Sequence, residues 1–182
     1  MSKIWFTSDT HFCHDKEFVW KNRGYSSVEK MNIDLINKWN ASVEYDDTVY
    51  HLGDVMLNNN DEGIKILSRL NGNIHIILGN HDTEKRKMLY ESIPMNVVDV
   101  LYADLFHVNK HRTFFLSHYP SLVANFDDNK RVWNLSGHTH TTDRFALKQN
   151  QVYNVGIDAH DGYPVQLEEI IEDLRKLRSH EI

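Results

Sequence analysis

The sequence has little or none of several features that mark other classes of protein. A single cysteine, Cys13, stands among 182 residues, so an intrachain disulfide framework is excluded and a reducing compartment is favoured. No run of about 18 apolar residues occurs, which excludes a membrane-spanning helix. Residues 1–3 lead directly into strand-like sequence without a signal-peptide pattern, and we therefore expect a cytoplasmic location with no membrane association.

An excess of basic charge is also absent. The 20 Lys and Arg residues are outnumbered by 26 Asp and Glu residues, which gives a net charge of −6 and a pI near 6.0. Such a chain presents no overall basic surface for nucleic acid. The charge does not exclude a small phosphorylated substrate that is held through a metal ion.

Low-complexity tracts, internal repeats and Pro- or Ser-rich linkers are missing as well. We therefore draw no domain boundary and expect residues 1–182 to form one domain, which is usual for a chain of this length. Histidine, in contrast, is abundant: the chain has 12, several of them beside Asp, Asn or Gly. This composition favours a soluble α/β enzyme.

Five apolar, β-prone runs each end in a cluster of polar residues. The runs are Lys3–Ser8, Thr48–Leu52, Asn73–Leu78, Thr113–Leu116 and Val132–Leu135. Their composition is typical of buried strands. Ligands of open α/β sheets lie beyond the carboxyl ends of the strands, so the clusters that follow these runs predict a functional site.

Helical patterns lie between several of the runs and after the last of them. Apolar residues at helical spacing follow the candidate N-cap Ser27, and Asn60 or Asp61 is a candidate cap for a second helix that ends before Gly72. Two further helices are predicted over Glu84–Ser92 and Leu167–Leu177. A closing hairpin is predicted from Phe145–Leu147 and Val152–Val155. This order predicts a sheet that is parallel at first and mixed later.

The polar clusters contain donors for metal ions. They supply two carboxylates, four imidazoles and one amide oxygen: Asp9, His11, Asp54, Asn80, His118, His138 and His140. Such a thiolate-free set of nitrogen and oxygen donors favours Mn²⁺, Fe²⁺, Ni²⁺ or Zn²⁺. It is too large for one tetrahedral zinc ion and of the right size for two ions that share a bridging carboxylate.

The order of the clusters resembles the calcineurin-like metallophosphoesterase superfamily. The pattern of that family is Asp-x-His, Gly-Asp, Gly-Asn-His-Asp/Glu, a lone His, and Gly-His-x-His. It stands in this chain as Asp9-Thr10-His11, Gly53-Asp54, Gly79-Asn80-His81-Asp82, His118 and Gly137-His138-Thr139-His140. The resemblance implies an α/β/β/α sandwich of mixed sheets flanked by helices, and among family members the chain is similar to the compact phosphoesterases of bacteria and phages.

The resemblance also implies a role for each donor. One metal ion would be held by Asp9, His11 and His140, the second by Asn80, His118 and His138, and Asp54 would bridge the two. A hydroxide shared between the ions would attack phosphorus. His81 would lie near the leaving-group oxygen, as proton donor or electrostatic stabiliser. We expect Mn²⁺, with Fe, Ni or Zn as alternatives, and a small phosphorylated substrate, of which a nucleotide is one example.

One departure from the family narrows the activity. Phosphoprotein phosphatases of the superfamily carry Gly-Asp-x-x-Asp-Arg-Gly, whereas residues 53–59 here read Gly-Asp-Val-Met-Leu-Asn-Asn, which disfavours a protein phosphatase. We favour a phosphodiesterase of small or nucleotide-like substrates, with a metal-dependent nuclease or a phosphomonoesterase as alternatives. A scaffold that kept the fold and lost the activity is disfavoured because every block is intact. No protein partner is predicted, and the oligomeric state stays open.

For several other polar residues the sequence allows two interpretations of their role. His14 points toward the substrate phosphate, together with Asn80, or else is a solvated loop residue. Asp158 and His160 are expected behind a ligand or at the surface, and Lys85–Lys87 is a solvated helix face or attracts an anionic substrate. We interpret Cys13 as a packing residue. The remaining lone histidines are interpreted as structural or solvated: His51, His75, His107, His111 and His180.

Overall fold

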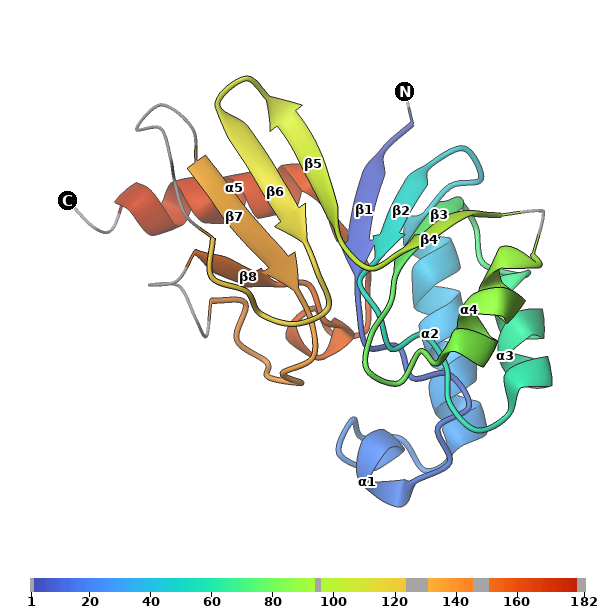
Figure 1. The fold of residues 1–182 in the computed structure, drawn as a ribbon. Helices are drawn as coiled ribbons and strands as arrows, with labels where there is room; N and C mark the ends of the chain where they lie inside the picture. The colour runs from blue at the N-terminus through green and yellow to red at the C-terminus, as the bar shows by residue number, and fades with distance from the viewer. Residues whose placement is uncertain (1, 94–95, 124–130, 146–150, 180–182) are drawn as a thin grey trace.

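A computed structural model describes residues 2–93, 96–123, 131–145 and 151–179, which form two β-sheets that face each other (Figure 1). The first sheet has the strand order β4-β3-β2-β1-β9 and the second the order β5-β6-β7-β8. Within these ranges, no helix combines the length and apolar character that crossing a bilayer requires.

The first sheet aligns the ends of its central strands. It contains β1 (Ile4–Thr7), β2 (Thr48–His51), β3 (Asn73–Ile77), β4 (Val97–Leu101) and β9 (Val165–Gln166). The first four strands are parallel, and only β9 runs antiparallel, beside β1. In the register, Thr7 pairs with His51, which in turn pairs with Ile76. The loops that follow β1, β2 and β3 therefore leave the sheet at the same edge.

The second sheet brings its own strand ends to the same region. It contains β5 (Asp104–Asn109), β6 (Arg112–Leu116), β7 (Arg131–Ser136) and β8 (Val152–Asn154). β6, β7 and β8 are parallel, and β5 is an antiparallel edge strand. Because Leu116 pairs with Leu135, the loops with His118 and His138 begin side by side.

Aromatic and aliphatic side chains fill the space between the two sheets. Phe6 of β1 is fully buried, and its ring meets Phe106 and Phe114 of the second sheet edge to face at centroid distances of 5.6 and 6.4 Å. Burying a side chain of this size contributes about 1.5–3 kcal/mol to folding. Leu167 and Ile170 of α5 (Leu167–Ser179) belong to the same core cluster, so this helix fixes both sheets.

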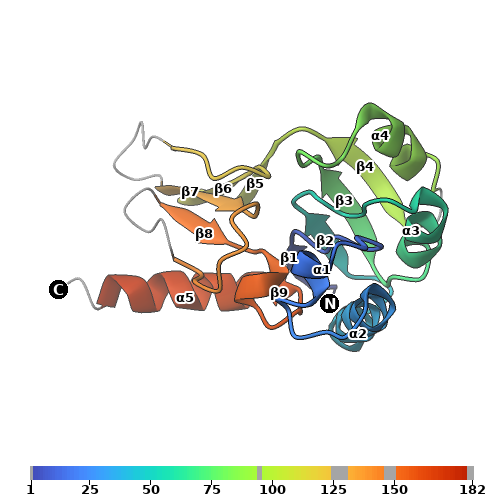
Figure 2. The same cartoon turned by 90° about the horizontal axis from the view of Figure 1, so that it is seen from below.

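Helices complete the sandwich. α2 (Val28–Ser42), α3 (Asn60–Leu67) and α4 (Glu84–Glu91) lie on the outer side of the first sheet, and α5 runs alongside β8 and β9 (Figures 1 and 2). The short α1 (Glu17–Trp20) lies beyond the carboxyl edge of the first sheet. Two mixed sheets flanked by helices confirm the predicted fold class.

The sequence patterns predict most element positions and miss a few. The side chain of Ser27 caps α2 as expected, whereas Asn59 caps α3 instead of Asn60 or Asp61, and Gly72 lies in the loop beyond that helix. β4, β5 and β9 were not predicted. The predicted hairpin partner Phe145–Leu147 lies largely outside the described residues, and β8 is paired in parallel with β7.

Candidate metal centre

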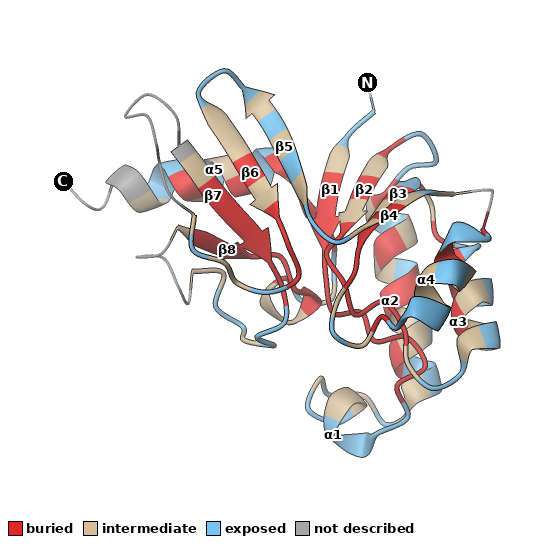
Figure 3. Ribbon diagram, viewed as in Figure 1, coloured by how far each residue is buried: buried red, intermediate tan, exposed pale blue. Residues whose placement is uncertain are grey.

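The loops beyond the carboxyl ends of the strands are buried, and their backbone is strained. Figure 3 shows burial continuing from β1 and β2 into the loops that follow. Five predicted metal ligands have positive φ: Asp9 (59°), His11 (48°), Asp54 (56°), His138 (69°) and His140 (50°). For a residue with a Cβ, this conformation costs roughly 1–2 kcal/mol. Such strain clusters at functional sites, where the surrounding structure enforces it.

Two glycines let these loops approach one another. A Cβ on Gly79 would lie 2.3 Å from Oδ1 of Asp54, and a Cβ on Gly137 would lie 2.2 Å from Oδ2 of Asp9. Both distances are far below any van der Waals contact. The glycines of the Gly-Asn-His and Gly-His-x-His blocks are therefore required for close packing of the carboxylates against the neighbouring backbone.

Asp82 ties two of the loops together. Its buried carboxylate accepts hydrogen bonds from the backbone nitrogens of Asp54 (2.7 Å), Gly79 (2.9 Å) and Val55 (3.3 Å) and from the hydroxyl of Tyr90 (2.6 Å). Burial and the contact with Asp82 raise the pKa of Tyr90. These bonds hold Asp54 and the Gly79 loop in a fixed relation.

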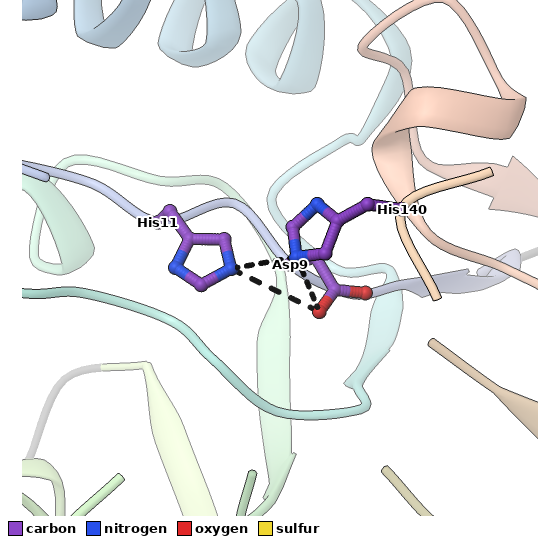
Figure 4. A group of neighbouring side chains, drawn as sticks. All are labelled: Asp9, His11 and His140. Atoms are coloured by element: carbon purple, nitrogen blue, oxygen red, sulfur yellow. Dashed lines mark hydrogen bonds and ion pairs between the residues drawn. The ribbon is translucent and has the colours of Figure 1, made fainter. Parts of the chain in front are cut away.

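Asp9, His11 and His140 form one group of potential ligands (Figure 4). The Nε2 atoms of His11 and His140 lie 3.1 Å apart, at 4.0 and 3.7 Å from Oδ1 of Asp9. The other carboxylate oxygen of Asp9 accepts a hydrogen bond from the backbone nitrogen of His138. Among the described residues, the buried Oδ1 of Asp9 has no hydrogen-bond partner.

His118, Asn80 and His138 form a second group. Nε2 of His118 lies 2.9 Å from Oδ1 of Asn80 and 3.2 Å from Nδ1 of His138. Nδ1 of His118 lies 2.8 Å from the carbonyl oxygen of Leu52. A carbonyl oxygen can only accept a hydrogen bond, so Nδ1–H of His118 is the donor and Nε2 keeps a lone pair that faces Asn80 and His138.

Asp54 lies between the two groups. Its Oδ2 is 3.7 Å from Nε2 of His11 and 3.5 Å from Nε2 of His118. Its Oδ1 accepts a hydrogen bond from the backbone nitrogen of His81. Burial raises the pKa of this carboxyl by more than His118 and the hydrogen bond from the backbone of His81 lower it, and the nearby carboxylates of Asp82 and Asp9 add to the rise.

These donors fit divalent cations. Two pairs of imidazole nitrogens face each other at hydrogen-bond distance, and the buried Oδ1 of Asp9 has no hydrogen-bond partner in the described part of the chain. Burial first, and then the charges of Arg23 and His140, lower the pKa of His11, and burial and His118 lower the pKa of His138. Neutral imidazoles and carboxylates are the protonation states that ligate metals.

Asp158 and Arg23 stand behind His140. Oδ2 of Asp158 lies 2.8 Å from Nδ1 of His140, and this hydrogen bond raises the pKa of the imidazole. Burial alone would raise the pKa of the Asp158 carboxyl, but hydrogen bonds from His140 and Arg23 outweigh burial and lower it. Of the two positions predicted for Asp158, the structure shows the one behind a ligand.

His81 and His14 lie at the rim of the centre. Nε2 of His81 is 3.9 Å from Oδ2 of Asp54, and its side chain is 44% exposed. Arg86 donates a hydrogen bond to the backbone oxygen of His81, so it is not merely a solvated residue of α4. The ring of His14 is buried and lies 5.4 Å from the ring of His11. His14 is therefore not a solvated loop residue.

A cavity of about 900 Å³ opens beside the centre. His11, His81 and His140 line one end, and α1 and the residues that follow it form a wall with Phe18 and Tyr25. This volume is within the range of pockets that hold small organic ligands.

The structure brings all seven predicted ligands together with His81 and His14. His51 is fully buried and His75 pairs with Asp99, as expected of structural residues, while His107 and His111 are exposed. His160 is buried and bonds to the backbone of Asn154, away from the ligands. Cys13 packs in the core, and His180 lies outside the described residues.

Sequence reasoning assigned no role to Arg23 or Asp82 and did not predict the contact of Arg86 with the backbone of His81, although all three residues hold the site. Asp82 lies within the Gly-Asn-His-Asp block, so its position was a usable signal. The Arg23–Asp158 contact joins residues 135 positions apart, and no local pattern indicates it.

Two facing sheets with carboxylates and imidazoles converging at their strand ends define a metal-dependent α/β enzyme. The profile of the calcineurin-like phosphoesterase superfamily domain matches residues 2–162, and the chain belongs to this family. It is therefore a phosphoesterase domain.

Similar proteins come from archaea, phages and bacteria. The chain is 33% identical to an uncharacterized protein of Methanocaldococcus jannaschii, over 97% of this chain and 93% of that protein. It is 29% identical to the gene 66 protein of Mycobacterium phage L5, over 100% and 98% of the two chains. The crystal structure of a protein of unknown function from Aquifex aeolicus superimposes on this chain with a TM-score of 0.71 at 24% identity. The match covers 94% of this chain and 99% of that one, and it supports the fold.

Gly79→Ala tests whether close packing of the loops builds the centre. The added Cβ would collide with Asp54, so we expect Mn²⁺ affinity to fall at least about tenfold and the free energy of unfolding to fall by about 1–3 kcal/mol. Calorimetric titration with Mn²⁺ and urea unfolding of metal-free protein measure the two effects.

Gly24→Ala is the matched control. Gly24, unlike Gly79, has a positive φ of 83°, and open space surrounds the position of its Cβ, so an added methyl group brings strain without a collision. We expect this variant to lose about 1–2 kcal/mol of stability from strain and to bind Mn²⁺ as the wild type does. Equal Mn²⁺ affinity in both glycine variants would contradict the role of Gly79.

Proposed function

We propose that this protein hydrolyses small, nucleotide-like phosphodiesters with two divalent cations, of which Mn²⁺ is our first choice. The observation that carries the proposal is the position of Asp54, whose Oδ2 lies 3.7 and 3.5 Å from imidazole nitrogens of two separate donor groups. A carboxylate with one oxygen facing two ligand groups is what a bridging residue requires. Family membership supports hydrolysis of phosphoesters.

In this proposal the donors divide between two ions. Asp9, His11 and His140 hold one, Asn80, His118 and His138 hold the other, and Asp54 contacts both. When bound, the cations would lower the pKa of a coordinated water and neutralise phosphate oxygens. Asp9 also lies close to Asp54 and His118, so both carboxylates contribute negative charge near the second ion.

His81 is the proposed catalytic residue. Its backbone is fixed by hydrogen bonds to Asp54 and from Arg86, while its ring stays partly exposed at the cavity. A ring on a fixed backbone, directed at the space beside the donors, is placed to give a proton to a leaving oxygen. His14 and Asn80, beside it, are proposed to contact the phosphate.

The cavity favours a diester over a monoester. Three cationic side chains line it: Lys16, Arg23 and Lys38. Arg23 is paired with Asp158, and Lys38 with Asp34 at 2.9 Å. Of these three cations Lys16 alone is then left for the second negative charge of a phosphomonoester, whereas a diester carries one charge and a second organic group that the cavity can hold.

The alternatives receive less support. A nuclease needs an extended basic surface, and the chain has a net charge of −6. We further propose a single domain, because α5 near the end of the described chain shares a core with β1. The free thiol of Cys13 fits a reducing compartment, and we propose the cytoplasm.

The first test of the function is hydrolysis by metal-free protein with and without Mn²⁺. We expect Mn²⁺-dependent cleavage of bis-p-nitrophenyl phosphate and at least about tenfold slower cleavage of p-nitrophenyl phosphate, a loss of about 1.4 kcal/mol of transition-state stabilisation. Release of p-nitrophenolate measures both. Faster cleavage of the monoester would contradict the diester preference, and no cleavage with any divalent metal would contradict the function.

Two substitutions separate catalysis from metal binding. His81→Ala removes a ring that is not a ligand, so we expect Mn²⁺ binding to persist while kcat falls about 10²- to 10⁴-fold. Asp54→Asn removes the bridging charge, so we expect weaker Mn²⁺ binding together with lost turnover. Calorimetry and steady-state kinetics distinguish them. If His81→Ala bound no metal, the division of roles would be wrong.

A further inference from the structure

We propose that Arg23 and Asp158 form a positioning pair that orients His140 for its metal ion, and that Arg23, although it lines the substrate cavity, does not bind the phosphate. This inference rests on the proposed function, since it assigns His140 to a metal ion. Neither Arg23 nor Asp158 belongs to any of the five sequence blocks that carry the proposed metal ligands.

Asp158 determines which nitrogen of His140 is available to a metal. Its Oδ2 accepts a hydrogen bond from Nδ1 of His140 at 2.8 Å. With the proton on Nδ1, the lone pair lies on Nε2, and Nε2 faces Oδ1 of Asp9 at 3.7 Å. A carboxylate behind a histidine ligand fixes both the tautomer and the orientation of the ring. This matters for His140 because its side chain is 42% exposed.

Arg23 fixes Asp158 in turn. Its Nε and Nη2 contact the two carboxylate oxygens of Asp158 at 2.8 and 2.9 Å. Nη2 also donates to the backbone oxygen of Asp9 at 2.8 Å. The side chains are only 9% and 14% exposed, so this bidentate pair is shielded from solvent, and its geometry is specific to arginine.

The hydrogen bonds of Arg23 leave little for a phosphate. A guanidinium has five N–H groups. Nε and Nη2 are engaged by Asp158 and Asp9, and Nη1 faces the backbone oxygen of Thr10 at 3.3 Å and the sulfur of Met31 at 3.7 Å. A phosphate would have to displace buried partners, one of them a carboxylate. The cavity arginine therefore acts on the protein and not on the substrate.

The pair joins separate parts of the fold at the centre. Arg23 follows α1 in the cavity wall, Asp158 lies in the 3-10 helix Ile157–Ala159 after β8, and Arg23 also contacts the Asp9 loop. Movement of the wall would thus change the orientation of His140, because Arg23 contacts Asp158 and Asp158 contacts His140.

The test compares Asp158→Ala and Arg23→Met with the wild-type full-length chain. Calorimetric titration of metal-free protein gives Mn²⁺ affinity, and kinetics on bis-p-nitrophenyl phosphate at saturating Mn²⁺ give kcat and KM. We expect both variants to bind one Mn²⁺ about 10- to 100-fold more weakly, with KM within about twofold of wild type. Arg23→Lys should show most of this loss because an ammonium lacks the bidentate geometry.

Two further variants keep the test decisive. Lys21→Met removes a cation two positions from Arg23 whose side chain is 67% exposed, and we expect wild-type Mn²⁺ affinity. Should Asp158→Ala fail to fold, as judged by thermal unfolding of metal-free protein, Asp158→Asn retains the shape and an acceptor for His140. It removes the charge that holds Arg23, and we still expect weaker Mn²⁺ binding, by at least about threefold.

Three outcomes would count against the inference. Wild-type Mn²⁺ affinity in the Asp158 variants would overturn this inference and leave the proposed function standing. A raised KM and weaker inhibition by inorganic phosphate in Arg23→Met, with unchanged Mn²⁺ affinity, would show that Arg23 is a phosphate ligand. Wild-type protein that binds no Mn²⁺ would overturn the proposed function and this inference with it.

Discussion

The structure depends on one electrostatic constraint: two buried carboxylates and several imidazole nitrogens converge where the neighbouring arginines of the described residues already have other partners. Asp9 and Asp54 are each at most 2% exposed, and one oxygen of Asp9 has no hydrogen-bond partner among the described residues. An uncompensated buried anion is costly. Arg23 and Arg86, the cations nearby, are occupied by Asp158 and by the backbone of His81. Metal ions are the counter-charge for which the arrangement is suited.

The two sheets and the loops at their strand ends hold these donors together despite an unfavourable backbone conformation. Parallel strands end at one edge, and the loops beyond them adopt left-handed backbone conformations at five proposed ligands. Glycines at Gly79 and Gly137 leave room for Asp54 and Asp9 where a Cβ would collide with them. The carboxylate of Asp82 then ties the Asp54 loop to the Gly79 loop. Because such strain is distributed over loops anchored to a two-sheet core, the fold itself sets the positions of the proposed ligands.

Much of this follows from the sequence, and the rest depends on contacts between distant residues. Apolar runs with polar ends predicted five strands and the ligands behind them, and Ser27 marked the start of α2. β4 was missed because Asp99 interrupts its apolar run and pairs with His75 across the sheet, and β5 because it is a half-exposed edge strand. Asp158 was expected behind a ligand or at the surface, but its contact with Arg23 at 2.8 Å joins residues 135 positions apart, and no local pattern indicates it.

The most direct test of the account is the number and position of the bound ions. Crystals of the protein soaked in Mn²⁺ would be measured at the manganese absorption edge, where anomalous scattering locates each ion independently of its ligands. The account predicts two peaks, one beside Asp9, His11 and His140 and one beside Asn80, His118 and His138, each within about 2.0–2.3 Å of its donors and both next to Asp54. A single peak, or two peaks of which one lacks Asp54, would contradict it.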